Sequence, residues 1–270
     1  MNFSLICPSI RPELWNEMCN SLSDNKLDWE ILFIGPKSPI NKLPKNAKWI
    51  ETSVKPSQCT HIGFIKAEGE YTSLTADDAL YFTPDHNGAL DNMYKFIKNF
   101  PKGDTYNKEG IAYGFRMFED QYCSETSHTH YIIPKEYERP QSMRSPLLYP
   151  FFVIKKETYL EVGGYDNRFI CGQAENDFLY RVYLRYGHTQ GSLCPTAMVW
   201  AIHDKHNNTS GYRKYHEYEC SLMRKLWIYE HEGDTTRWNR ERSDDRIRGY
   251  INDDSLLTIS QGYRGDGEWQ

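Results

Sequence analysis

Two adjacent carboxylates, Asp77 and Asp78, follow a short stretch with the composition of a buried strand, Tyr71 to Ala76. Carboxylate oxygens are good ligands for hard divalent cations, so an acidic pair at the end of a strand is a candidate metal site. The alternative is a solvated turn or a helix cap, because aspartate is common in both places. The pair alone leaves both interpretations open, and the neighbouring elements have to decide between them.

A third carboxylate, Glu175, lies in the first turn of a helix predicted from Ala174 to Tyr186. At about 100° per residue, Glu175 shares a helix face with Leu179 and Val182, so we expect its side chain to point towards the core. Burial raises the pKa of a carboxyl group and a helix N-terminus lowers it, and this balance makes Glu175 a candidate general base. The alternative is a first-turn acid that only complements the helix dipole.

Two further side chains could take part in this chemistry. Asp177 points to the opposite helix face, where Arg181 lies four residues on, so the spacing predicts a surface ion pair. His203 ends an apolar segment that starts at Met198 and is a candidate metal ligand. The alternative for His203 is a structural histidine held by hydrogen bonds.

Segments typical of strands and of helices alternate over the first part of the chain. Apolar runs predict strands, and apolar residues at helical spacing predict helices between them. The strands are expected at 3–7, 29–34, 48–52 and 71–76, and the helices at about 14–22, 56–68 and 85–99. This alternation is typical of an α/β protein with a mostly parallel central sheet flanked by helices.

Each of these predicted strands ends in polar residues. Because the carboxyl ends of parallel strands meet at one edge of a sheet, where open α/β sheets bind ligands, we expect these residues to lie together. They are Ser9 and Arg11, then Lys37, then Thr52 with Lys55, and finally Asp77 with Asp78. The acidic pair therefore belongs to a predicted binding edge.

The second half of the chain gives weaker signals. Strands are predicted near 110–117, at 147–154 and up to His203, and helices at about 156–162, 174–186 and 212–229. Residues 232–270 are polar and offer little core material, which predicts a partly ordered tail.

The composition excludes several classes of protein. The 270 residues carry a net charge of −5, which argues against a nucleic-acid binder that relies on a basic surface. The 7 cysteines include no C-x-x-C pair, so neither a zinc site nor a disulfide framework is expected. No apolar run could span a bilayer and no signal peptide opens the chain, which predicts a cytoplasmic protein, with peripheral membrane attachment as an alternative. Neither a G-x-G-x-x-G fingerprint nor a P-loop is present.

Five short segments occur in an order that carries a family resemblance. They are Pro8-Ser9-Ile10-Arg11, like P-[ST]-x-[RN]; Cys59 to Gly63 with Gly69 to Tyr71, like R-N-x-G and A-x-G-[ED]-Y; Leu74 to Asp78, in the place of a D-x-D metal motif; Val162 to Asp166, like G-G-[FY]-D; and Gly172 to Phe178, like G-G-E-D-x-[ED]-[FL]. In order and spacing, the chain from residue 3 to residue 203 resembles the family 2 inverting glycosyltransferases, which have a GT-A fold.

The resemblance implies a metal-dependent glycosyltransferase that moves a sugar from a nucleoside diphosphate sugar, with UDP as the expected nucleotide, to an acceptor hydroxyl with inversion. Glu175 is the implied base, Mn²⁺ or Mg²⁺ the implied cofactor, and Asp77 with His203 the implied metal ligands. Acceptor contacts are implied at Gly164, Tyr165 and Asp177. The implied nucleotide-sugar contacts are Pro8, Ser9, Arg11, Lys37, Thr52, Lys55, His61, Thr75, Ala76 and Asp78.

The resemblance also implies a division of the chain. A GT-A glycosyltransferase domain is expected at 1–205, with a nucleotide-binding half at about 1–100 and an acceptor half at about 101–205. A C-terminal helix and polar tail would occupy 206–270. The acceptor stays open among a glycan, a lipid-linked glycan, a protein and a modified DNA base, and a homo-oligomer is compatible with the sequence.

The chain departs from the family pattern at two motifs. Thr75 replaces the first aspartate of D-x-D, and Ala174-Glu175 replaces the E-D pair, so the implied base is a glutamate. These substitutions keep open a non-catalytic carbohydrate- or nucleic-acid-binding protein on the same fold. A sugar-nucleotide nucleotidyltransferase is the other alternative, but its glycine-rich loop after the first strand is missing from Pro8 to Arg11.

Overall fold

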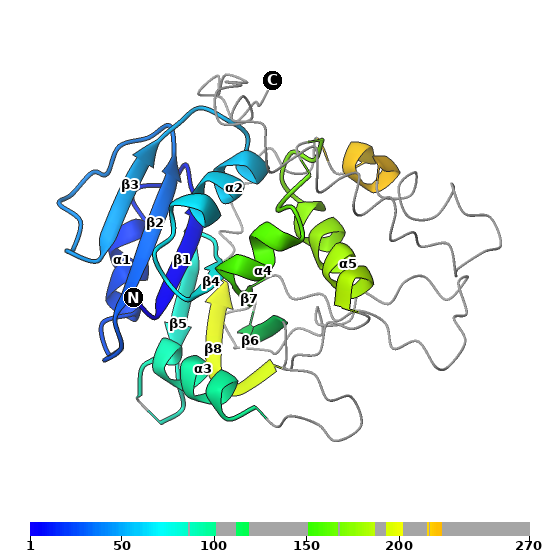
Figure 1. The fold of residues 1–270 in the computed structure, drawn as a ribbon. Helices are drawn as coiled ribbons and strands as arrows, with labels where there is room; N and C mark the ends of the chain where they lie inside the picture. Colours follow the sequence, from blue (N-terminus) through cyan, green and yellow to red (C-terminus); the bar gives the residue numbers. More distant parts are fainter. Residues whose placement is uncertain are drawn as a thin grey trace.

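One mixed sheet of eight strands forms the centre of the described structure (Figure 1). The computed structural model describes residues 1–85, 87–100, 112–118, 151–166, 168–186, 193–201, 215 and 217–222. The strands are β1 Phe3–Pro8, β2 Trp29–Gly35, β3 Ala47–Glu51, β4 Tyr71–Leu74, β5 Ala79–Phe82, β6 Ala112–Phe118, β7 Phe152–Lys155 and β8 Leu193–Ala201. The helices are α1 Trp15–Ser21, α2 Pro56–Lys66, α3 Ala89–Lys98, α4 Lys156–Glu161 and α5 Ala174–Tyr186.

The strands lie in the order β3-β2-β1-β4-β7-β6-β8-β5. β1 pairs in parallel with β2 and with β4, and β2 pairs in parallel with β3. Beyond β4 the sheet is mixed, because β7 runs antiparallel to β4 and β6, and β5 runs antiparallel to β8, whereas β6 and β8 are parallel. The predicted α/β architecture is confirmed, with its parallel strands concentrated in the first hundred residues.

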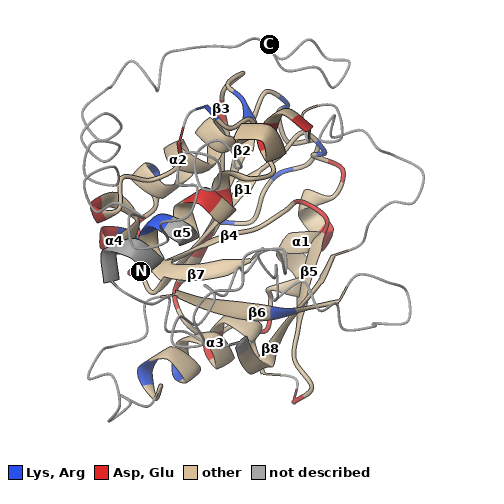
Figure 2. Cartoon of the chain, turned by 90° about the vertical axis from the view of Figure 1, so that its right-hand side faces the viewer, with Lys and Arg blue, Asp and Glu red and all other residues tan. Residues whose placement is uncertain are grey.

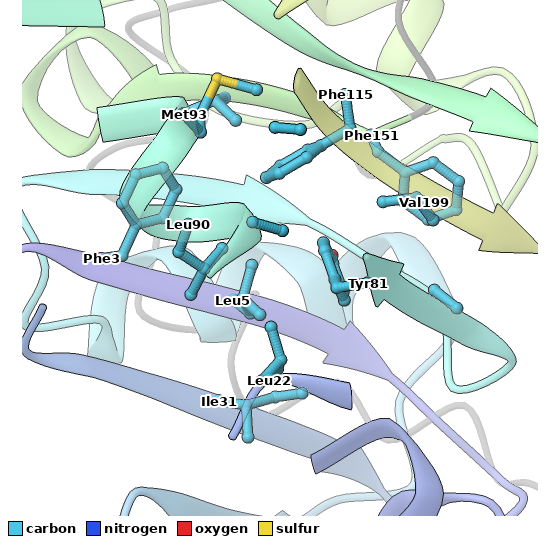
Figure 3. Packing of buried hydrophobic residues seen from close by; sticks show 14 of the residues in the cluster. Phe3, Leu5, Leu22, Ile31, Tyr81, Leu90, Met93, Phe115, Phe151 and Val199 are labelled. Atoms are coloured by element: carbon cyan, nitrogen blue, oxygen red, sulfur yellow. The ribbon is translucent and has the colours of Figure 1, made fainter. Parts of the chain in front are cut away.

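Apolar side chains cover both faces of the sheet. Along β1, Leu5 belongs to one buried cluster and Ile6 to the other, as the alternation of a strand requires. Figure 3 shows the first cluster, which α1 and α3 cover and in which Leu22 and Leu90 pack near Leu5. Helices α2, α4 and α5 cover the second face. β1 and β4 carry no charged residue, as Figure 2 also shows, which is typical of strands buried on both faces.

One predicted helix starts later than the sequence indicated. The helix expected at 85–99 begins at Ala89, and the apolar run before it forms β5, which pairs with β8 from far along the chain. The helix expected at 212–229 is described only at residue 215 and at 217–222, where it is helical, and the tail at 232–270 lies outside the described residues. None of the described helices has the length and apolar character needed to cross a membrane.

Helix α2 approaches the sheet closely at Gly63. A Cβ atom at this position would lie 2.2 Å from Cγ2 of Ile6 in β1 and 2.6 Å from Cδ1 of Ile34 in β2. A side chain here would push α2 away from the strands, and the loop that starts α2 lies at the carboxyl edge of the sheet. The glycine therefore helps to set the position of the candidate site.

We expect Gly63→Ala to destabilise the protein by about 1–3 kcal/mol through this overpacking. The sign is opposite to that of helix propensity, which favours alanine over glycine by about 1 kcal/mol. Urea unfolding measures the change, and the Ile6→Ala background, which lacks Cγ2, is the control. An equal loss of stability in both backgrounds would show that the Ile6 contact is not the cause.

Candidate active site

Side chains that follow β1 and β4 meet at the carboxyl edge of the sheet. Ser9 Oγ donates to Asp77 Oδ2 at 2.6 Å, and Trp15 Nε1 donates to Ser9 Oγ at 2.6 Å. Arg11 Nε donates to Asp77 Oδ1 at 2.9 Å, its backbone N–H donates to Oδ2 at 3.3 Å, and its Nη2 also contacts Oδ1. Arg11 Nη2 lies 3.1 Å from Asp78 Oδ2. The structure thus brings together four residues that the sequence placed at this edge.

These contacts leave Asp77 poorly suited to a cation in the described arrangement. Its two oxygens accept four hydrogen bonds, from Ser9 and Arg11, and a carboxylate offers about four lone-pair sites. Burial opposes the charge of Arg11, but hydrogen bonds and charge attraction from Asp77 and Asp78 raise its pKa above the ordinary value. A divalent ion at Asp77 would therefore have to displace a guanidinium that stays charged.

The second predicted metal ligand, His203, lies outside the described residues. Within the part of the chain that the structure describes, no three side chains of His, Cys, Asp or Glu are grouped to hold a metal ion. The described side chains around Asp77 therefore do not fit Mn²⁺ or Mg²⁺ as they stand.

The other predicted nucleotide contacts after β1, β2 and β3 lie along the same edge. Pro8 and Thr52 are half-buried, and Lys37 is exposed. The backbone N–H of Thr52 donates to the carbonyl of Gly35 at 3.2 Å, which extends the pairing of β3 with β2. Lys37 is accordingly the residue of this group that solvent and ligands reach most easily.

Thr75 and Ala76 extend β4 rather than facing a ligand. The N–H of Thr75 donates to the carbonyl of Ile6 at 2.8 Å, and the buried Thr75 hydroxyl accepts a hydrogen bond from the Tyr81 hydroxyl at 2.7 Å. Ala76 packs against the first apolar cluster. The threonine that replaces an acid of D-x-D therefore serves the packing of β5 against β4.

Lys55 is the N-cap residue of α2 and is 7% exposed. Burial lowers the pKa of its ammonium group, and the negative charges of Asp166 and Glu219 oppose that shift. A cation is thus placed at the start of α2, where the helix dipole also favours anions.

His61 does not join the cluster around Asp77. Its Nδ1 lies 3.1 Å from the Tyr159 hydroxyl, and a Cβ on Gly164, whose φ is +67°, would lie 2.6 Å from the same nitrogen. Burial, with the charge of Arg181, lowers the pKa of His61 to about 4, so the imidazole stays neutral. From α2, His61 packs against Tyr159 of α4, and its role as a nucleotide contact stays a prediction.

Glu175 occupies the start of α5 and is half-buried. Removal from water raises the pKa of its carboxyl group to about 8, a backbone hydrogen bond opposes the shift, and the negative charge of Glu219 adds to it. A carboxyl group with this pKa exchanges its proton near neutral pH, as a general base requires. Of the two opposing effects that the sequence analysis named, burial is the larger one here.

The loop before α5 is tied to the start of α2. Ser57 donates its backbone N–H to the carbonyl of Ile170 at 3.0 Å and its hydroxyl to that of Phe169 at 2.6 Å. Because α2 follows the carboxyl end of β3, these bonds place the loop before Glu175 beside the β3 end of this edge.

Tyr165 is buried close to Glu175, whose charge adds to the effect of burial in raising the pKa of the tyrosine. None of the described residues hydrogen-bonds to its hydroxyl. The carbonyl of the preceding residue, Gly164, accepts a hydrogen bond from Arg181 Nη2. Of the predicted acceptor contacts, Tyr165 is thus the one whose polar atom lies near the candidate base.

Asp177 corrects the prediction of a surface ion pair. It forms an ion pair with Arg181, from Nε to Oδ2 at 2.9 Å, and the two side chains are 0% and 1% exposed, so this is a buried pair and not a surface pair. Arg181 Nη1 also donates to the carbonyl of Val162 at 2.8 Å. The helical wheel failed because α5 is covered on a second side by the turn after α4. Asp177 is too buried in this arrangement to contact an acceptor.

Sequence reasoning missed Glu219 altogether. It is fully buried and accepts hydrogen bonds from three successive backbone N–H groups in the loop before α5. The only signal in the sequence was the helical spacing predicted around it, which says nothing about a contact with a loop 47 to 49 residues away.

No protein-family model and no curated protein matches the chain. Solved structures do: residues 1–349 of TarS from S. aureus match with a TM-score of 0.54 and 15% identity, over 97% of this chain and 73% of that one. The same fragment with UDP-GlcNAc matches at 0.54 and 15%, over 97% and 74%. With UDP it matches at 0.53 and 14%, over 97% and 73%. At such identities the likeness concerns the fold, and it confirms the predicted GT-A fold.

The buried pair gives a test of the role of Asp177. We expect Asp177→Asn to cost about 3–5 kcal/mol of stability, because it leaves the buried Arg181 guanidinium without its carboxylate. Urea unfolding measures the loss, with the exposed Asp24→Asn as a control that changes the same group in water. A variant of normal stability with a raised KM for an acceptor would instead restore Asp177 as an acceptor contact.

Proposed function

We propose that the chain is a glycosyltransferase that moves a sugar from a UDP-sugar to an acceptor hydroxyl with inversion. The observation that carries the proposal is Glu175, a half-buried carboxyl group with a pKa of about 8 at the start of α5, after a loop that is bonded to the start of α2 in a GT-A fold. The five family-like segments and the UDP and UDP-GlcNAc complexes of TarS, a protein of the same fold, support a nucleotide-sugar donor.

In the proposed reaction Glu175 accepts the proton of the acceptor hydroxyl. The hydroxyl oxygen then bonds to the anomeric carbon as the bond from that carbon to the diphosphate oxygen breaks, and UDP leaves with the electron pair. Attack from the face opposite to the leaving group inverts the configuration. A screen of UDP-sugars for hydrolysis or transfer distinguishes a hexose donor from a pentose donor.

The donor would lie along the edge formed by the ends of β1, β2 and β3. Arg11 and Lys55 supply positive charge there for the diphosphate, and Ser9 is held in place by Trp15 and Asp77. Mn²⁺ or Mg²⁺ is the cofactor that the family resemblance implies, but Arg11 engages its implied ligand Asp77, so the proposed binding of UDP does not depend on the ion. A cytoplasmic location and a homo-oligomer likewise stay predictions.

The role of Glu175 is tested by Glu175→Gln, which keeps the size of the side chain and removes the base. We expect UDP affinity within about twofold of wild type and sugar transfer, or UDP-sugar hydrolysis where no acceptor is known, reduced by about 10²–10⁴-fold. The exposed Glu157→Gln in α4 is the matched control. Normal turnover of a UDP-sugar by Glu175→Gln would refute the assignment.

The metal requirement is tested by calorimetry of UDP binding with Mn²⁺ and with EDTA. Because Arg11 saturates Asp77, we expect wild-type binding to change less than about threefold between the two conditions. Arg11→Ala should bind UDP weakly in EDTA and regain affinity with Mn²⁺, since Asp77 is then available as a ligand; the exposed Lys42→Ala is the control. Wild-type binding that is lost in EDTA would establish the metal-dependent site.

A further inference from the structure

Glu219 holds the loop that leads to the candidate base. Its Oε1 accepts the N–H groups of Ile170 and Cys171, both at 2.7 Å, and its Oε2 accepts that of Gly172 at 2.8 Å. Successive backbone N–H groups that converge on one anion form a nest, which stabilises a carboxylate without a cation. The arrangement orders three consecutive residues just before α5.

Two carbonyl groups of the same loop are also hydrogen-bonded. Ser57 in the first turn of α2 donates to the carbonyls of Phe169 and Ile170. The loop is therefore hydrogen-bonded to α2 through its carbonyls and to Glu219 through its N–H groups. Helix α5 begins at Ala174, shortly after the last bonded residue. The position of Glu175 therefore depends on a residue from the C-terminal part of the chain.

The helical segment at 217–222 is fixed to the domain by more than this carboxylate. Leu222 packs against the second apolar cluster, and the Tyr218 hydroxyl donates to the carbonyl of Arg168 at 3.3 Å. These contacts keep Glu219 buried, whereas Glu217 of the same segment is exposed.

Glu219 also acts on Glu175 through its charge. Among the described residues, the groups that interact electrostatically with Glu175 are Glu219 and, in the segment between α4 and α5, Cys171 and Tyr165. The negative charge of Glu219 raises the pKa of both Glu175 and Cys171, so the thiol stays neutral and Glu219 is the charged neighbour of the base.

We infer that Glu219 is a positioning residue for Glu175, which fixes the start of α5 and places a negative charge beside the base. The inference rests on the proposed function. It assigns to the segment at 217–222 a role in catalysis that the predicted division of the chain at residue 205 did not include.

Glu219→Gln in the full-length chain tests the inference, with the exposed Glu217→Gln as a control for the same change on the same segment. Wild-type kcat/KM for a UDP-sugar should rise with pH through a midpoint near 8, because the deprotonated Glu175 is the base. Removal of the neighbouring negative charge should move that midpoint down by roughly 0.5–1 unit. Glu217→Gln should leave it in place.

A purely structural anchor predicts a different outcome: Glu219→Gln would lower the melting temperature and leave the midpoint unmoved, which would overturn the inference. If Glu219→Gln does not fold, Glu219→Asp keeps the charge but withdraws it by one methylene. Glu219→Asp should then lower kcat at least tenfold with little change in the KM for the donor, and an unchanged kcat would overturn the inference.

A direct titration separates failure of this inference from failure of the proposed function. The carboxyl carbon of Glu175, assigned by its loss in Glu175→Gln, can be followed by NMR in wild type and in Glu219→Gln without any substrate. A shifted titration with no turnover of any UDP-sugar would refute the transferase but keep the coupling. An unshifted titration refutes the coupling whatever the activity.

Discussion

The parallel pairing of β1 with β4 is the constraint on which the candidate site depends. The register joins Ile6 to Leu74, and the N–H of Thr75 continues the ladder to the carbonyl of Ile6. Both strands then end at the same level, so Ser9 and Asp77, 68 residues apart in the chain, come within hydrogen-bonding distance. Because both faces of β1 are buried, a shift of register by one residue would exchange its core faces, and the pairing is fixed accordingly.

Carboxylates around the site are stabilised in different ways, and the differences divide their roles. Asp77 and Asp177 each lie against a guanidinium, and Glu219 lies in a nest of backbone N–H groups. Such partners tie the carboxylate to the structure. For Glu175 burial is the larger effect, and a like charge adds to it. Glu175 is thus the carboxyl group best able to exchange a proton at neutral pH, and the contacts of the neighbouring residues hold it in place.

Local patterns predicted the parts of the fold that depend on local physics. The apolar runs of β1, β2 and β4 and the helical spacing of α2 and α5 identify those elements, and Glu175 follows from its place in α5. What the sequence could not show depends on distant partners. β5 forms because β8 pairs with it, and Asp177 is buried because the turn after α4 covers α5. Glu219 is buried against a loop that lies far back in the chain. The sequence predicted Arg11 and Asp77 at one edge, but it did not predict that hydrogen bonds from Arg11 would occupy the oxygens of Asp77.

The substitution at Thr75 changes the charge of the donor edge in a way that suits Arg11. An aspartate at this position would give the edge three neighbouring acids, with Asp77 and Asp78, against one guanidinium. The Thr75 hydroxyl instead accepts a hydrogen bond from Tyr81, which leaves two acids that share Arg11. A diphosphate is itself an anion, so each acid removed from its binding edge lowers the repulsion that a cation must offset. The chain thereby reduces the negative charge at the place where the resemblance to D-x-D proteins is weakest, and a protein cation stands beside Asp77 where the motif implies a metal ion.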